Sequence, residues 1–364
     1  MSPLRPRPTP LLAPLGRAWL AVAAARNAAY DRGWLQAHDA GVPVVSVGNL
    51  TAGGTGKTPF VAWLAGELRR SGRTVAIVSR GHGGAPPAPV VVVEHDPARP
   101  GHAARVAGDE PAMLAAAGAA DLVVVGRDRV AAARLAAARG ADVAVLDDGF
   151  QHRRLARRLD IVLVDARDPF GGGRALPAGL LRESPAGLAR ADLCVLTRAG
   201  PELAARDGWL EPERLPPEFA AQLARLGPAA PPVCAAALRP QALELPDGRC
   251  VAPDALAGRP VLLVSGIAGP QGFARTVAAL GARIAAHLAW PDHHPFSPAD
   301  ARRIAEALRE SGAELIVTTR KDRIRWPQDA PEPAVLDVGI ETAAGPRIVA
   351  RVLDAIGPRE PDRR

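Results

Sequence analysis

Short apolar runs rich in β-branched residues alternate with alanine-rich stretches of helical character from about residue 44 to about residue 197. Nearly every position within these runs is apolar, which predicts strands that are buried on both faces. Such strands, separated by helices, are typical of a mostly parallel sheet flanked by helices. The expected strands are residues 44–47, 74–78, 122–125, 143–146, 161–164 and 193–196, with 90–93 as an edge strand.

A second block of alternating elements follows a stretch of proline, alanine and glycine at residues 227–232. That composition is typical of a linker, so we expect a second, smaller α/β unit beyond it. Its expected strands are 233–238, 261–264, 315–317 and 335–338, and its expected helices are 271–280 and 298–311. The predicted domains are an N-terminal segment (1–36), a larger domain (37–226), the linker (227–232) and a smaller domain (233–364) that closes over the cleft.

The N-terminal segment is strongly basic. Its arginines are Arg5, Arg7, Arg17, Arg26 and Arg32, against the single acid Asp31. Its apolar residues follow the spacing of one helix face, at Leu12, Leu15, Trp19, Val22 and Tyr30. No uncharged run is long enough to cross a bilayer, and Arg17 interrupts the apolar region that a signal peptide needs. We expect a basic amphipathic helix on an anionic membrane surface; the alternative is a helix packed on its own domain.

Composition narrows the class of protein. At 364 residues and 48% hydrophobic composition, the chain can bury a large core. Cys194, Cys234 and Cys250 are far apart in the sequence, so neither a disulfide framework nor a structural zinc site is expected, and a reduced, cytoplasmic protein fits. The net charge is +7, but aromatic residues make up only 4% of the chain, too few for a base-stacking platform. We expect no nucleic-acid partner.

Lysine is almost absent from this basic chain. Of 45 basic residues, only Lys57 and Lys321 are lysines. A retained lysine indicates a site that needs a compact ammonium instead of the planar fork of arginine. For Lys321 we therefore predict a place in the cleft between the domains, where it supplies charge to a phosphate or to an acid of the larger domain; chance survival is the alternative.

Residues 51–58 read Thr-Ala-Gly-Gly-Thr-Gly-Lys-Thr and lie between the strand 44–47 and an expected helix at 59–70. This is the place of a phosphate-binding loop, in which backbone N–H groups and the helix N-terminus surround nucleotide phosphates. Lys57 would reach the β- and γ-phosphates, and the Thr58 hydroxyl would ligate Mg²⁺. Pro59 falls in the first turn of the helix, where a missing N–H costs nothing. The expected nucleotide ligands are Thr51, Ala52, Gly53, Gly54, Thr55, Gly56, Lys57 and Thr58.

Two pairs of acids could complete a kinase site. Asp147 and Asp148 end the apolar strand 143–146, as the metal-binding acids of phosphate-loop enzymes do. Asp109 and Glu110 precede an expected helix at 111–117. Both pairs could instead only cap helices. A sugar kinase, however, needs a base within hydrogen-bond reach of the acceptor hydroxyl, and an Asp held by a histidine meets that need.

Seven blocks of the sequence together resemble the tetraacyldisaccharide 4′-kinase family of lipid A synthesis. They are GNLTAGGTGKTP (48–59), SRG (79–81), GDEP (108–111), LDDGFQHR (146–153), LPAG (176–179), LRE (181–183) and PDH (291–293). The resemblance extends from about Arg17 to Asp322. It implies transfer of the ATP γ-phosphate, with Mg²⁺, to the 4′-hydroxyl of a lipid-linked glucosamine disaccharide 1-phosphate at the cytoplasmic face of the inner membrane.

The resemblance also implies roles for single residues. Asp109 would be the general base, paired with His293 of the second domain. The implied metal-side acids are Glu110, Asp147 and Asp148, and the implied substrate-facing residues are Gln151, His152 and Arg182, with Lys321 added on the argument above. Two positions depart from the family. His82 stands where a tyrosine is usual, and Arg320 stands where a glutamate is usual.

Two other functions remain open at this point. The segment Thr319-Arg-Lys-Asp322 faintly resembles a guanine-reading element, which would favour a GTPase. A membrane-associated nucleotide-switch ATPase without a lipid acceptor is the second alternative. The block Asp292-His293-His294 could be a metal site, although adjacent residues seldom ligate one ion.

Overall fold

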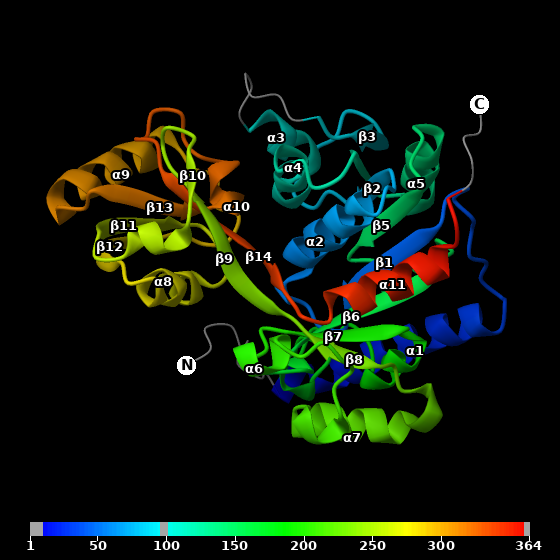
Figure 1. Cartoon of the computed structure of the whole chain (residues 1–364). Helices are drawn as coiled ribbons and strands as arrows, with labels where there is room; N and C mark the ends of the chain where they lie inside the picture. Colours follow the sequence, from blue (N-terminus) through cyan, green and yellow to red (C-terminus); the bar gives the residue numbers. More distant parts are fainter. Residues whose placement is uncertain (1–9, 95–100, 360–364) are drawn as a thin grey trace.

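Two lobes, each built on its own sheet, make up the molecule (Figure 1). The computed structural model describes residues 10–94 and 101–359, so Arg5 and Arg7 of the predicted basic segment lie outside the described residues. An eight-stranded sheet forms the core of the first lobe, and a six-stranded sheet forms the core of the second. Among the described helices, none is long and apolar enough to cross a membrane.

The sheet of the first lobe has the strand order β3-β4-β2-β5-β1-β6-β7-β8. All neighbouring strands are parallel except the edge pair β3 and β4. Each strand predicted between residues 44 and 197 is present, which confirms the α/β fold class. The strands are β1 (Val44–Asn49), β2 (Val75–Ser79), β3 (Val90–Val92), β4 (Leu122–Gly126), β5 (Val143–Asp147), β6 (Leu159–Asp165), β7 (Leu193–Thr197) and β8 (Val233–Ala235).

Helices cover both faces of this sheet, because its strands are apolar on both sides. One face packs on α2 (Lys57–Arg70), α4 (Asp109–Ala116) and α11 (Gly345–Ile356). The other face packs on α5 (Arg129–Ala138), α7 (Pro217–Leu226) and part of α1 (Ala13–Asp31). The short helices are α3 (His102–Ala107) and α6 (Pro201–Ala204).

The second lobe has the strand order β10-β9-β14-β13-β11-β12. The pairs β13–β14, β11–β13 and β11–β12 are parallel, whereas β9 runs antiparallel to β14 and to β10. Its strands are β9 (Ala237–Glu244), β10 (Cys250–Val251), β11 (Pro260–Ser265), β12 (Arg283–Ala289), β13 (Leu315–Thr319) and β14 (Ala334–Glu341). Its helices are α8 (Pro270–Ala279), α9 (Pro298–Ser311) and α10 (Arg320–Arg323).

The boundary between the lobes differs from the one that composition predicts. The expected strand 233–238 is two strands, because β8 pairs with β7 in the first lobe and β9 begins only at Ala237. The paired strands β9 and β14 then lead into the second lobe and back (Figure 1). After β14 the chain returns to the first lobe, where α11 buries Ile348 and Val352 against the core around Phe60. The linker-like composition of residues 227–232 cannot show that a later segment returns to the first lobe.

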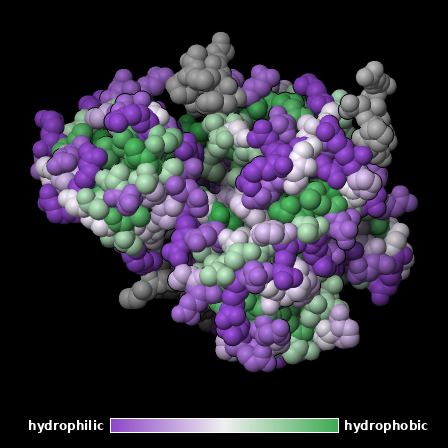
Figure 2. Space-filling model, viewed as in Figure 1, coloured by the Kyte–Doolittle hydropathy of each residue, from purple (hydrophilic) through white to green (hydrophobic). Residues whose placement is uncertain are grey.

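Helix α1 packs on the first lobe with one side only. Gly16 is its one buried residue, and a backbone oxygen of Ala175 lies 3.1 Å from where a Gly16 Cβ would stand. On the outward side Leu15 and Val22 are 56% and 67% exposed. Leu11, at 91%, and Trp19, at 45%, are also exposed. We call Leu11, which lies in the 3-10 helix Pro10–Leu12 just before α1, together with Leu15, Trp19 and Val22 of α1, the apolar row of α1. Elsewhere hydrophilic residues cover much of both lobes (Figure 2).

Candidate active site

The predicted phosphate-binding loop connects β1 to α2. Gly53 and Gly56 have φ angles of 113° and 83°, which only glycine adopts without strain, and Gly56 is the N-cap of α2. The Asn49 side chain donates to Thr55 Oγ1 at 3.0 Å, and the Thr197 hydroxyl donates to the Thr55 carbonyl at 2.7 Å. The ends of β1 and β7 thus hold the loop from both sides.

Thr51 replaces the first glycine of such loops without backbone strain. Its φ is not positive, its side chain is buried, and its backbone bridges to Leu181. Ala52 N–H donates to the Leu180 carbonyl at 2.7 Å. The first two residues of the loop are therefore fixed by Leu180 and Leu181, at the start of the LRE block, and a β-branched residue fits there.

Asp147 is the last residue of the buried strand β5, and Asp148 follows it beside the loop. Asp148 has a φ of 53°, an uncommon conformation for a residue with a side chain. Its carboxylate lies 3.6 Å from Lys57 Nζ and accepts from Arg182 Nη1 at 2.8 Å. Burial alone would raise the pKa of Asp148, but Lys57 and Arg182 outweigh it and hold that pKa below its ordinary value.

Asp147 is the more deeply buried acid. Burial, and then the nearby charges of Glu110 and Asp148, raise the pKa of Asp147 to about 7. Its Oδ2 accepts from the Ser79 hydroxyl at 3.4 Å, whereas Oδ1 is buried without a hydrogen-bond partner. A carboxylate oxygen left in this state fits a cation, which would lower the pKa and satisfy the orphan oxygen.

The described part of the chain does not form a closed metal cage by itself. Among the described residues, no three His, Cys, Asp or Glu side chains come close enough to hold an ion together. Mg²⁺ in nucleotide sites commonly takes one or two carboxylates together with phosphate oxygens and water. Asp147, with its unpartnered Oδ1, therefore fits Mg²⁺ bound with a nucleotide; the predicted acids Glu110, Asp147 and Asp148 do not come close enough to hold one ion together without it.

Two of the predicted substrate-facing residues, Gln151 and Arg182, belong to one network beside Asp148. Gln151 donates to Glu183 Oε1 at 3.0 Å and lies 3.5 Å from Arg182. Helix α1 closes the network, because Asn27 donates to Glu183 Oε2 at 3.0 Å and Trp19 Nε1 donates to the Arg182 carbonyl at 2.7 Å. The N-terminal helix is thus part of the wall of the site.

His152 is held next to a buried arginine. Arg129 Nη1 lies 3.3 Å from His152 Nδ1, and since guanidinium nitrogens only donate, Nδ1 must accept. Nε2 then carries the proton, and it is buried without a partner. Burial, and then the charges of Arg129, Arg157 and Arg26, lower the pKa of His152 to about 4. The result is a neutral ring with one unsatisfied donor.

Asp109 begins α4 and is contacted from the second lobe. Gly108, with a φ of 86°, lets the chain pass close to His82, since a Cβ there would stand 2.1 Å from the His82 carbonyl oxygen. His293 Nδ1 lies 2.9 Å from Asp109 Oδ2, and Arg325 Nε lies 3.3 Å from the same oxygen. The predicted pair of Asp109 and His293 is therefore present across the two lobes.

Lys321 lies at this junction, as the scarcity of lysine in the chain predicted. The acid that it pairs with, Asp292, belongs to the second lobe and not to the first. The Lys321 Nζ is 2.7 Å from Asp292 Oδ1 and 3.2 Å from His293 Nε2. The neighbouring Asp322 is fully buried, where Thr319, the Gly266 N–H and Arg325 all donate to its carboxylate. An acid bound in this way cannot read a guanine base, which removes the feature that favoured a GTPase.

Sequence reasoning missed four residues of the site: Asn27, Arg129, Glu183 and Arg325. Glu183 lies in the LRE block next to Arg182, so its position in that block was a readable signal. Arg325 follows Asp322 at the i,i+3 spacing of a helical ion pair, which was a readable signal. Arg129 and Asn27 carried no signal, because each is defined by partners far away in the sequence.

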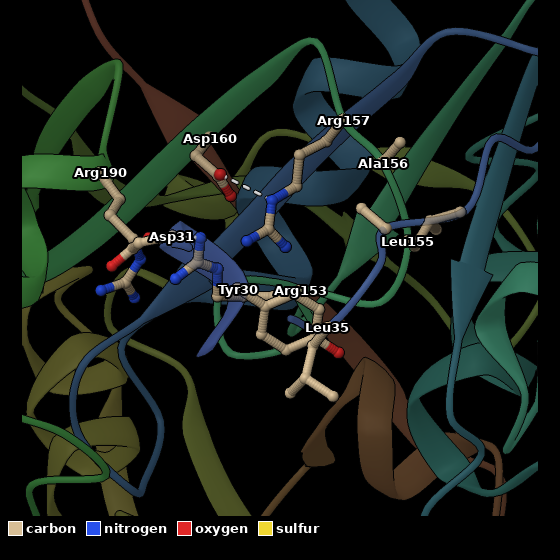
Figure 3. Close-up of a pocket in the computed structure, with 10 residues that line it drawn as sticks. Tyr30, Asp31, Leu35, Arg153, Leu155, Ala156, Arg157, Asp160 and Arg190 are labelled. Carbon is tan, nitrogen blue, oxygen red and sulfur yellow. Dashed lines mark hydrogen bonds and ion pairs between the residues drawn. The ribbon is translucent and has the colours of Figure 1, made fainter. Parts of the chain in front are cut away.

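A separate concavity lies at the opposite end of β6, between α1 and the start of that strand (Figure 3). Its arginines are each paired with an acid: Arg157 with Asp160, Arg153 with Asp31 and Arg190 with Glu183. Arg153 also lies over the Tyr30 ring at 5.1 Å. These pairs neutralise the arginines, so the concavity attaches α1 to the lobe and offers no unpaired charge to an anion.

Known proteins resemble this chain over nearly its whole length. The "Tetraacyldisaccharide-1-P 4'-kinase" family model matches residues 8–356. A tetraacyldisaccharide 4′-kinase of Anaeromyxobacter dehalogenans strain 2CP-C is 43% identical over 362 residues, which is 96% of this chain and 89% of that protein. The Chromobacterium violaceum tetraacyldisaccharide 4′-kinase is 41% identical over 322 residues, covering 87% and 84%.

A solved structure supports the same relationship. It is described as the "apo" form of LpxK from Aquifex aeolicus in complex with ATP. It matches with a TM-score of 0.70 and 28% identity over 95% of this chain and 98% of that chain. Together with the family model and the relatives, it confirms the resemblance that the sequence blocks indicated: the chain belongs to the tetraacyldisaccharide 4′-kinase family.

Proposed function

We propose that this protein transfers the γ-phosphate of ATP to the 4′-hydroxyl of a lipid-linked glucosamine disaccharide 1-phosphate. The observation that carries the proposal is the contact of Asp109 with His293, which places a hydrogen-bonded carboxylate between the lobes. Family membership makes the chain a kinase of lipid A biosynthesis. The phosphate loop and the adjacent acids supply the nucleotide half of such a site.

The residues support a direct transfer. Asp109 accepts the proton of the acceptor hydroxyl as the hydroxyl oxygen bonds to the γ-phosphorus and the bond to the ADP oxygen breaks. Lys57 and the N-terminus of α2 stabilise charge on the phosphates. Mg²⁺ would be held by the nucleotide together with the Thr58 hydroxyl and one or two of the acids Glu110, Asp147 and Asp148, and would offset the remaining phosphate charge.

The acceptor is expected to lie along the wall formed by Gln151, His152 and Arg182. Arg182 offers guanidinium donors to sugar hydroxyls or a phosphate, and His152, whose Nε2 is buried, forms part of the wall. Because α1 contacts this wall, an acceptor embedded in a membrane can reach the site while the apolar row of α1 rests on the lipid. This arrangement supports a peripheral position at the cytoplasmic face of the inner membrane.

The test is phosphate addition detected by mass spectrometry. The purified full chain is mixed with ATP, Mg²⁺ and the disaccharide 1-phosphate acceptor, and parallel reactions contain GTP or lack the acceptor. We expect a product heavier by one phosphate with ATP, and nucleotide turnover that depends on the acceptor. Equal turnover without the acceptor would favour the switch ATPase, and a preference for GTP would favour the GTPase.

A further inference from the structure

His293 lies in a loop of the second lobe that is fixed in an uncommon conformation. Its φ is 60°, and its neighbour His294 lies 3.0 Å from Asp300 Oδ2 through Nε2. Arg325 Nη1 also donates to the His294 carbonyl at 3.1 Å. A residue with a side chain remains in the left-handed region only when its surroundings hold it there. The lobe therefore holds the backbone of His293 in place, and the orientation of the 51% exposed ring depends on the partners of its two nitrogens.

Both nitrogens of that ring have partners. Nδ1 lies 2.9 Å from Asp109 Oδ2, and Nε2 lies 3.2 Å from Lys321 Nζ. An ammonium group has donors only, so Nε2 must accept and cannot carry a proton. The remaining proton of the neutral ring is then on Nδ1, where it is donated to Asp109.

We propose that Lys321, held by Asp292, is a positioning residue that keeps His293 as the neutral Nδ1–H tautomer facing Asp109. The inference rests on the proposed function and adds a residue to its mechanism. In this tautomer His293 gives Asp109 Oδ2 a fixed donor, and Arg325 approaches the same oxygen. Oδ1 is then the oxygen that can turn to the acceptor hydroxyl.

The charges around the ring explain why a cation is needed. Asp109 faces it from α4, and Asp292 Oδ2 lies 3.8 Å from Nε2 on its own loop. Without an ammonium, two carboxylates would flank the ring and favour the doubly protonated form or a proton on Nε2. Lys321 donates to Nε2 and pairs with Asp292 at 2.7 Å. Its charge therefore disfavours the doubly protonated ring, and its hydrogen bond disfavours a proton on Nε2.

The choice of lysine fits this geometry. Lys321 serves two acceptors with one nitrogen, whereas a guanidinium fork would spread its donors in a plane and reach them with different geometry. In a chain that otherwise uses arginine, Lys321 is the only lysine outside the phosphate loop. Its side chain is 19% exposed, so it is not a freely solvated surface charge.

The experiment is ¹⁵N NMR of the full chain with labelled histidine, recorded without substrate at neutral pH. The His293→Gln spectrum identifies the His293 signals. In the wild type we expect a proton on Nδ1 and none on Nε2. In Lys321→Met we expect Nε2 to become protonated, and Lys321→Gln, which also removes the ammonium but keeps Asp292, should shift the signals in the same direction. Arg323→Met is the matched control, because Arg323 is on the same short helix but pairs with Glu332.

Kinetics provide the second measurement. We expect Lys321→Met to lower kcat by about 10- to 100-fold, less than loss of the base itself, with little change in KM. A wild-type ring protonated on Nε2, or Lys321→Met signals identical to wild type, would overturn the inference. If the wild-type chain adds no phosphate to the acceptor, the proposed function fails, while the NMR result still decides the tautomer. Should Lys321→Met not fold, Lys321→Gln gives the same decision.

Discussion

At the scale of single residues, the site depends on side chains whose properties are set by a few close partners. Asp109 is contacted by His293 and Arg325, both from the second lobe. Asp148 is held by Lys57 and Arg182 from the first. Each acid has a distinct environment, which suits the different roles of base and metal ligand that we propose for them.

Replacing the base should separate catalysis from nucleotide binding. We expect Asp109→Asn to lower kcat by at least about 100-fold, the range for loss of a positioned base, with little change in ATP affinity. His293→Ala should lose less, and the double variant should be no worse than Asp109→Asn alone, because the two side chains act as a unit. Steady-state kinetics measure kcat, and calorimetry measures the affinity for ATP. Asp329→Asn, which changes an exposed acid, is the control. Losses that multiply would show that the two residues work independently.

The buried His152 should make stability depend on pH. Its pKa is about 4 in the folded chain against an ordinary value of 6.5, so between these values the unfolded chain binds a proton that the folded chain does not. The contribution is present above pH 6.5 and is lost as the pH falls toward 4. Urea unfolding at several pH values should therefore show a smaller acid destabilisation in His152→Gln than in the wild type.

An opposite contribution must be kept constant in that comparison. Burial raises the pKa of Asp160 to about 6, so its contribution is lost as the pH rises through that value. Both proteins retain Asp160, and the difference between them therefore reports His152. Parallel pH curves for the two proteins would contradict the assignment of a neutral, buried ring.

At the scale of elements, α1 serves two surfaces. Its inner side contributes Asn27 to the wall of the site, while the apolar row faces solvent. Trp19 belongs to both, because it is 45% exposed and also donates to the Arg182 carbonyl. Removing the whole segment would therefore damage the site as well as any membrane contact.

A cleaner test changes only the outward residues that touch nothing in the site. We expect the double variant Leu15→Ser, Val22→Ser to bind anionic vesicles at least about 10-fold more weakly, since burying one such side chain contributes about 1.5 kcal/mol or more. Binding of the wild type should also weaken with salt, because its arginines attract anionic lipid. Co-sedimentation measures both. Trp209→Ser, an exposed apolar residue outside α1, is the control; equal binding by all three proteins would leave α1 a structural helix.

At the scale of the whole molecule, the chain passes from the first lobe to the second and back. Strands β9 and β14 connect the lobes. Arg320 of α10 links these two strands to each other, because it pairs with Glu244 of β9 and with Asp337 of β14. Leu238 of β9 lies beside the phosphate loop, 3.5 Å from where a Gly56 Cβ would stand. The connection between the lobes thus touches the nucleotide site as well as the second lobe.

Because α11 returns to the first lobe, a change in it should destabilise that lobe. We expect Ile348→Ala to lower the free energy of unfolding by roughly 2–5 kcal/mol, as for other fully buried aliphatic residues. Limited proteolysis in rising urea, read by mass spectrometry, should place the first new cuts within residues 37–226. The equally buried Val277→Ala in α8 should instead open the second lobe first. Cuts in the second lobe for both variants would contradict the packing of α11.

Much of the nucleotide half of the site is determined by the sequence alone. Its strand, glycine-rich turn and helix N-terminus are consecutive residues, and their conformations follow from local preferences such as the positive φ of Gly56. Asp147 and Asp148 could be placed because they end an apolar strand. The strands themselves were predictable because burial on both faces leaves a continuous apolar run.

The tertiary structure alone decided what crosses between distant segments. Asp109 and His293 are 184 positions apart, and only the packing of the lobes brings them to 2.9 Å. Tertiary packing also decided the partners of Lys321, the unpartnered nitrogen of His152 and the return of α11 to the first lobe. The physical reason is that a local pattern reports which face of an element is buried, but not which other element buries it.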